Sequence, residues 1–124
     1  MRVLLAVLLL ALALPMTAAA DHLDVIEFEL NEGCSFDKYM KIVNDFNAQW
    51  GSQNGYKAEI LTPIQSHNLV SMYWVGRTAN AAAYGKAWDA WRDGQADPSS
   101  VAAKLAARFQ ACGTNLGRRG YDTH

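Results

Sequence analysis

Hydrophobic and polar residues alternate along residues 25–30, and this pattern predicts the first β-strand. The apolar members would share one face, while Glu27 and Glu29 would lie on the other. An Asn-Glu-Gly turn follows, and then apolar residues recur at spacings of three and four. The second pattern predicts an amphipathic helix that Ser35 caps and that runs through Trp50.

Two further strands are expected at residues 56–62 and 69–75, joined by a loop at 63–68. The strand at 69–75 carries apolar residues at both even and odd positions. A strand that is buried on both faces reads in this way. Both faces of the sheet are therefore expected to be covered.

The C-terminal part is expected to be mainly helical. Thr78 can cap a helix over residues 79–93 that Gly94 ends, and Asp97-Pro98 can start a further helix. Only a weak final strand is expected around residues 115–121, because this tail is rich in glycine.

This order of elements predicts an α+β fold. A β-α-β-β-α-β chain forms a four-stranded antiparallel sheet with both helices on one face, the ferredoxin-like arrangement. We expect one such domain over residues 21–124, since no repeat or low-complexity segment divides it.

Residues 1–20 have the pattern of a secretory signal peptide: one arginine, an apolar run over residues 3–14, and small residues up to Ala20. The apolar run would span about 18 Å as a helix, too short for a bilayer core of about 30 Å. We expect cleavage after Ala20, a mature protein without a membrane segment, and a periplasmic or secreted location.

The chain contains two cysteines, Cys34 and Cys112. In an oxidising compartment an even number of cysteines favours a disulfide. The predicted topology supports this pairing, because the end of the first strand and the start of the last meet at one edge of the sheet. Two buried free thiols are the alternative.

Residues 56–63 and 73–77, followed by Ala82, Ala83, Trp88 and Trp91, resemble the dimeric α+β barrel superfamily. This superfamily includes antibiotic-biosynthesis monooxygenase-like and stress-responsive barrel proteins. The resemblance covers about residues 23–116. It implies a homodimer in which two sheets pack face to face, with a small-molecule pocket between each sheet and its helices. The helix at 79–93 lacks the histidine that several enzymatic members use.

Composition and motifs narrow the function. The formal net charge is −1, so no basic excess points to nucleic acid. No cluster with metal-ligand spacing and no nucleophile or nucleotide motif is present in the sequence, so neither a metal nor a cofactor is expected. His67 is expected to be an exposed loop residue, and the Glu27/Glu29 pair a solvated or ion-paired sheet face.

One polar residue and six aromatic residues are the candidate ligand-binding set. Asn47 interrupts the apolar stripe of the first helix, and pockets commonly place a few polar groups among apolar walls. A satisfied core or rim amide is the competing interpretation of Asn47, and plain core packing that of the aromatic residues. Arg77 could hold an anionic group. The full set is Asn47, Trp50, Tyr73, Trp74, Tyr84, Trp88 and Trp91.

Three functional hypotheses follow. The first is an exported, disulfide-stabilised homodimer that binds a small apolar or aromatic molecule. The second is a cofactor-independent monooxygenase in which Asn47, Trp74 and Trp88 position an electron-rich aromatic substrate, with no catalytic base identified. The third is a secreted interaction module without a pocket.

Overall fold

The structure is a computed structural model that describes residues 21–124. The expected signal peptide lies outside the described residues. The elements are β1 (His22–Leu30), α1 (Phe36–Gln49), a 3-10 turn (Gly51–Gln53), β2 (Lys57–Leu61), β3 (Met72–Thr78), α2 (Ala81–Gly94), α3 (Val101–Cys112) and β4 (Gly113–Asp122). None of the helices in this part of the chain is long and apolar enough to cross a membrane.

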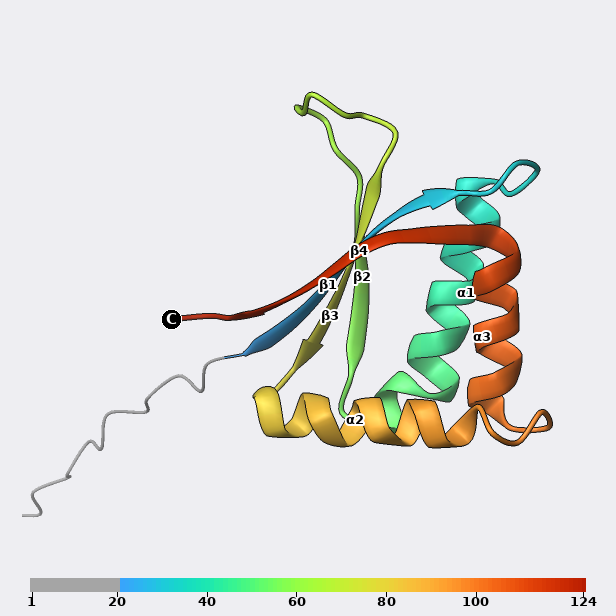
Figure 1. The fold of residues 1–124 in the computed structure, drawn as a ribbon, viewed down its shortest axis with the longest axis vertical. Coiled ribbons are helices and arrows are strands. Elements are labelled where there is room, and N and C mark those ends of the chain that lie inside the picture. Colours follow the sequence, from blue (N-terminus) through green and yellow to red (C-terminus); the bar gives the residue numbers. More distant parts are fainter. Residues whose placement is uncertain (1–20) are drawn as a thin grey trace, which may run out of the picture.

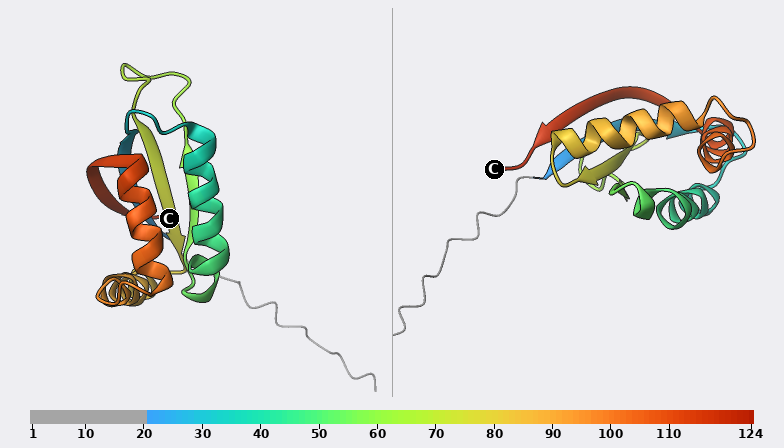
Figure 2. Two further views of the ribbon diagram at one scale, coloured as in Figure 1. Left: turned by 90° about the vertical axis from the view of Figure 1, so that its right-hand side faces the viewer. Right: turned by 90° about the horizontal axis from the view of Figure 1, so that it is seen from below.

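The four strands form one antiparallel sheet in the order β2-β3-β1-β4. This order and the chain connectivity are those of the ferredoxin-like arrangement, which confirms the predicted fold class. The helices lie on one side of the sheet, with α1 and α3 side by side and α2 crosswise at one end of both (Figures 1 and 2). The other sheet face carries no helix.

Helix α1 forms as its pattern predicts. The Ser35 side chain accepts a hydrogen bond from the Lys38 backbone N–H at 3.2 Å, which caps the first turn. The buried face of the helix consists of Tyr39, Ile42, Val43 and Phe46. This face packs toward the sheet and supplies the centre of the core.

The third strand begins three residues later than predicted, at Met72 instead of residue 69. The Asn68 side-chain oxygen accepts from the Val70 backbone N–H at 2.9 Å, so the chain still turns at this point. Leu69 and Val70 are therefore exposed loop residues. The strand keeps two apolar faces through its later residues, with Trp74 toward the helices and Val75 on the opposite side.

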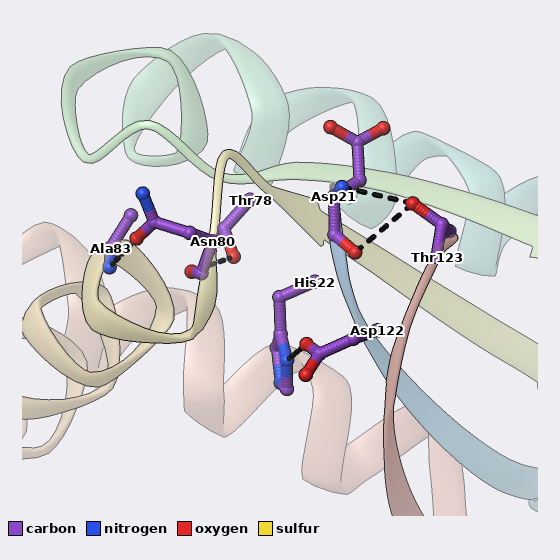
Figure 3. Close-up of polar contacts among 7 residues, drawn as sticks. All are labelled: Asp21, His22, Thr78, Asn80, Ala83, Asp122 and Thr123. Carbon is purple, nitrogen blue, oxygen red and sulfur yellow. Dashed lines mark hydrogen bonds and ion pairs between the residues drawn. The ribbon is translucent and has the colours of Figure 1, made fainter. Parts of the chain in front are cut away.

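Asn80, and not Thr78, caps the helix after β3. Its side-chain oxygen accepts from the Ala83 backbone N–H at 2.8 Å, as Figure 3 shows. Thr78 is the last residue of β3, and its hydroxyl donates to the Asn80 carbonyl at 3.1 Å (Figure 3). The shift arises because either residue is a good cap, and the end of β3 decides between them.

The further helix is separate and begins at Val101, beyond the predicted Asp97-Pro98 start. Ser100 caps it by accepting from the Ala103 backbone N–H at 3.0 Å. Asp97 instead accepts from Ser99, whose N–H and hydroxyl hold the pKa of this carboxyl below its usual value.

The final strand is the element that sequence patterns underestimated most. Strand β4 pairs along β1, with one irregularity opposite Glu27 and Phe28. At the far end, His22 lies 2.8 Å from an Asp122 oxygen, and the Asp21 N–H donates to the Thr123 hydroxyl at 2.9 Å (Figure 3). Pairing with a central strand therefore overcomes the low intrinsic strand propensity of the glycines.

The predicted Cys34–Cys112 disulfide is present, with the two Cα atoms 5.2 Å apart. Cys34 follows β1, and Cys112 is the last residue of α3. The Asn31 N–H also donates to the Cys112 carbonyl at 2.9 Å. The covalent bond thus fixes the point at which the chain passes from α3 into β4.

Candidate functional site

A cavity of about 280 Å³ lies between the helix-facing side of the sheet and the helices. More than half of its lining residues are aromatic, and its amide and charged side chains come from Gln95, just after α2, and from α3 and β4. The lining residues are Ile26, Tyr39, Phe46, Trp50, Tyr56, Trp74, Tyr84, Ala87, Trp88, Trp91, Gln95, Ala106, Phe109, Gln110, Asn115 and Arg118.

Phe46 of α1 is the centre of the aromatic wall. Its ring contacts five other rings, with centroid distances between 5.0 Å (Trp74) and 6.0 Å (Phe109). Four of these contacts are edge-to-face, the geometry that the ring quadrupoles favour. The wall is consequently a defined surface onto which a further aromatic ring can stack.

A chain of polar contacts runs along the sheet floor of the cavity. The Trp74 indole N–H donates to the Tyr56 hydroxyl at 2.8 Å, and this hydroxyl donates to Asp24 at 2.7 Å. Asp24, only 2% exposed, also accepts from Arg118 Nε at 2.7 Å and Nη2 at 2.6 Å. This bidentate pair places a buried carboxylate at the polar end of the site.

Gly76 leaves room for the Tyr56 hydroxyl, because it has no side chain. It pairs with Asp24 across β1 and β3 and with Ala58 across β2 and β3. A Cβ at Gly76 would lie 1.7 Å from the Tyr56 hydroxyl oxygen. Only a residue without a side chain lets the phenol cross the sheet surface to reach Asp24.

These surroundings perturb three titratable groups. Burial, together with the charge and hydrogen bond of Asp24, raises the pKa of Tyr56 far above its usual value. Burial and Asp24 also raise the pKa of Tyr84. Partial burial opposes the charge on Arg118, but its hydrogen bonds to Asp24 and the attraction between the charges outweigh this, and its pKa is raised. Both phenols therefore stay protonated and Arg118 stays charged at neutral pH.

The structure brings together five of the seven candidate ligand-binding residues at this cavity. These five residues are Trp50, Trp74, Tyr84, Trp88 and Trp91. Tyr73 does not join them, because its odd position in β3 places it on the helix-free face of the sheet with Val75. Arg77 lies on that face as well and pairs with Asp21 at 2.7 Å.

Asn47 does not line the cavity. Its side-chain amide donates to the Ala58 carbonyl at 2.9 Å and accepts from the Ala58 N–H at 2.8 Å. Both polar ends of the amide are thereby satisfied by one residue of β2. Asn47 joins α1 to this edge strand, which is the competing interpretation given above.

Sequence patterns missed the polar part of the site. Asp24 and Arg118 are 94 residues apart in the chain, and only the pairing of β1 with β4 joins them. One signal was present: Asp24 stands two residues before Ile26 in the alternation of the first strand, on its apolar face. A carboxylate at such a position needs a partner.

Comparisons with known proteins support the fold. No protein-family profile matches the sequence, and no curated protein matches it. The structure resembles SnoaB, a cofactor-independent oxygenase from Streptomyces nogalater, with a TM-score of 0.56 and 13% identity over 86% of this chain and 95% of that one. It also resembles a Bacteroides thetaiotaomicron protein of unknown function described as a possible oxidoreductase, with a TM-score of 0.54, 10% identity and coverage of 86% and 100%.

Proposed function

We propose that this protein binds a small aromatic molecule in the cavity between its sheet and its helices. The observation that carries the proposal is the aromatic wall around Phe46, open to a cavity of about 280 Å³ and bordered by the Asp24–Arg118 pair. Ligand pockets typically combine apolar walls with a few fixed polar groups. A cavity volume of about 280 Å³ suits a molecule with a single ring or with two fused rings.

Filling the cavity tests this proposal. Ala106 of α3 lines the cavity, whereas its neighbour Ala107 is exposed. We expect Ala106→Met to weaken binding of a two-ring ligand by about tenfold, because the longer side chain occupies the site. Ala107→Met is the matched control and should bind as the wild type does. Equal affinity in the two variants, measured by calorimetric titration, would place binding elsewhere.

Cofactor-independent oxygenation of the bound aromatic molecule is the second candidate function. The observation that favours it is the similarity in fold to SnoaB. Trp74 and Trp88, two of the residues expected to position a substrate, line the cavity. Oxygen-electrode measurements with quinol substrates test this candidate: uptake that is lost in Ala106→Met supports it, and no uptake across a broad quinol panel leaves binding as the function.

We further propose that the protein acts as a homodimer that associates through the helix-free sheet face. Val25 and Val75 pair on this face, and Tyr73 lies beside them. The β2–β3 loop projects from one end of the sheet (Figure 1), and its Ile64 is 91% exposed. Exposed apolar residues such as Ile64 are typical of an interface.

Light scattering at micromolar concentration should give twice the monomer mass. A Val25→Glu variant should be monomeric and folded by circular dichroism, because a further charge beside Val75 and Tyr73 opposes association. Ala107→Glu, on the exposed side of α3, should leave the dimer intact. A monomeric wild type would contradict the proposed assembly.

We also propose that the protein is exported to the periplasm or secreted from the cell. The Cys34–Cys112 bond supports it, since structural disulfides persist in oxidising compartments. Expression of the full chain in a secreting host should give a mature protein whose N-terminal sequence begins at Asp21. Recovery of the uncleaved chain in the cytoplasm would contradict export.

A further inference from the structure

The charge of Arg118 is already neutralised within the protein. Its guanidinium makes two parallel hydrogen bonds to Asp24, at 2.7 and 2.6 Å, and the Asp24 side chain is 3% exposed. Bidentate pairing of this kind is the strongest geometry available to an arginine and a carboxylate. A ligand approaching Arg118 therefore meets an ion pair and not a free cation.

Arg118 nonetheless keeps hydrogen-bonding capacity on the cavity side. Its guanidinium has five N–H groups, and Asp24 occupies only two of them. The guanidinium carbon lies 4.2 Å from the centre of the Trp88 ring, and both residues line the cavity. The donors of Arg118 thus lie beside an aromatic surface that a flat ligand would share.

The rest of the cavity offers no compensating charge. Among the residues that line it, Arg118 is the sole one with a charged side chain, and the other polar groups are amides, phenols and indole N–H groups. The Asp24 carboxylate lies beneath Arg118, where Tyr56 donates to it as well. An anionic ligand would lose its hydration without gaining an unpaired positive charge, and desolvation of an uncompensated ion is costly.

We infer that the cavity selects an uncharged aromatic molecule that presents a carbonyl-type acceptor to Arg118, and that it discriminates against the corresponding carboxylate. Asp24 is the specificity-determining residue, since its carboxylate offsets the charge of Arg118 and leaves an ion pair of zero net charge whose remaining N–H groups can donate. This inference rests on the proposed ligand-binding function and names the ligand class.

Two probes of equal ring size separate this selection from simple hydrophobicity. 2-Naphthamide is uncharged and polar, whereas 2-naphthoate carries a full negative charge in the same place. Calorimetric titration of the wild type at neutral pH should show the amide binding about tenfold more tightly. A carboxylate that binds as tightly as the amide, or more tightly, would overturn the inference while leaving the binding function intact. Binding of neither probe would overturn both.

Replacing Asp24 tests the mechanism of the selection. In Asp24→Asn the charge of Arg118 is uncompensated, so affinity for 2-naphthoate should rise about tenfold while affinity for 2-naphthamide stays within about threefold. Glu27→Gln is the matched control: it removes a carboxylate from the same strand on the opposite face, and the preference should not change. An unchanged preference in a folded Asp24→Asn protein would overturn the role of Asp24.

A measurement on the wild type covers the case in which Asp24→Asn does not fold. In the nitrogen-15 NMR spectrum, the Arg118 side-chain N–H signal should shift on saturation with 2-naphthamide, because the carbonyl accepts from the guanidinium. An unshifted Arg118 signal at saturation would overturn the proposed contact.

Discussion

Tyr56→Phe removes one oxygen atom and thereby two buried hydrogen bonds. The hydroxyl donates to Asp24 at 2.7 Å and accepts from the Trp74 indole N–H at 2.8 Å. Asp24 is 2% exposed and Trp74 6% exposed, so both former partners of the hydroxyl are buried side chains. The phenyl ring itself remains, and its contacts with Phe46 and Trp50 are kept.

The expected loss of stability follows from these two contacts. A hydrogen bond to a charged group contributes about 1.5–3 kcal/mol, and an unpaired buried donor costs about 1–3 kcal/mol. Because the two contacts share one atom and are not additive, we expect Tyr56→Phe to lower the free energy of unfolding by about 2–4 kcal/mol. That is a large share of the roughly 5–15 kcal/mol typical of a domain.

Urea unfolding followed by circular dichroism measures this loss. The midpoint should fall while the slope of free energy against urea stays unchanged, since the exposed area on unfolding is the same. Tyr121→Phe is the control, because Tyr121 is 49% exposed on β4 and should change stability by less than about 0.5 kcal/mol. A Tyr56→Phe protein no less stable than this control would refute the view that the hydrogen bonds of Tyr56 to Asp24 and Trp74 stabilise the folded protein.

Three further predictions concern the same framework. Gly76→Ala should destabilise the protein by about 1–3 kcal/mol in the same assay, because its Cβ would overlap the Tyr56 hydroxyl, whereas Gly85→Ala in α2, with open space around its Cβ, should be neutral or stabilising. Replacing both Cys34 and Cys112 by alanine should cost about 4–5 kcal/mol, since the bond closes a loop of 78 residues in sequence separation, and an unchanged melting temperature would contradict this. Stability should fall as the pH rises above about 10, because Tyr56 and Tyr39 ionise readily in the unfolded chain but have raised pKa values in the folded one; a flat alkaline profile in urea unfolding would contradict the burial of both phenols.

The sequence was sufficient for the order of elements and the disulfide. Alternation around Ile26 and helical spacing around Phe46 are local patterns, and local patterns survive in the fold. The Cys34–Cys112 pairing was predicted from the two cysteines of an exported chain and supported by the topology, which required only the correct edge of the sheet. The element boundaries at residues 69 and 79 were wrong because the Asn68 and Asn80 side chains fix the turns there.

The candidate site was predicted in part for a similar reason. The aromatic residues of α2 were sufficient to predict one wall of the cavity. The Asp24–Arg118 pair was not predicted, because it joins two strands that lie far apart in the sequence. Arg118 lies in a glycine-rich segment with weak strand propensity, and its importance emerges only when β4 pairs with β1 and meets Asp24. Asn47 was predicted to bind a ligand, but its hydrogen-bond partner is the Ala58 backbone. A polar residue in an apolar stripe indicates a hydrogen bond, and the sequence does not identify its partner.

Mapping a bound ligand by NMR tests the central claim most directly. All four tryptophans line the cavity, so each indole N–H signal reports on it. With 2-naphthamide added to the nitrogen-15 labelled protein, the indole signals of Trp88 and Trp91 should shift together with the side-chain signal of Arg118, while the backbone signal of Ile64 in the exposed β2–β3 loop stays in place. Shifts confined to that loop, or none in the cavity at ligand saturation, would contradict a binding site between the sheet and the helices.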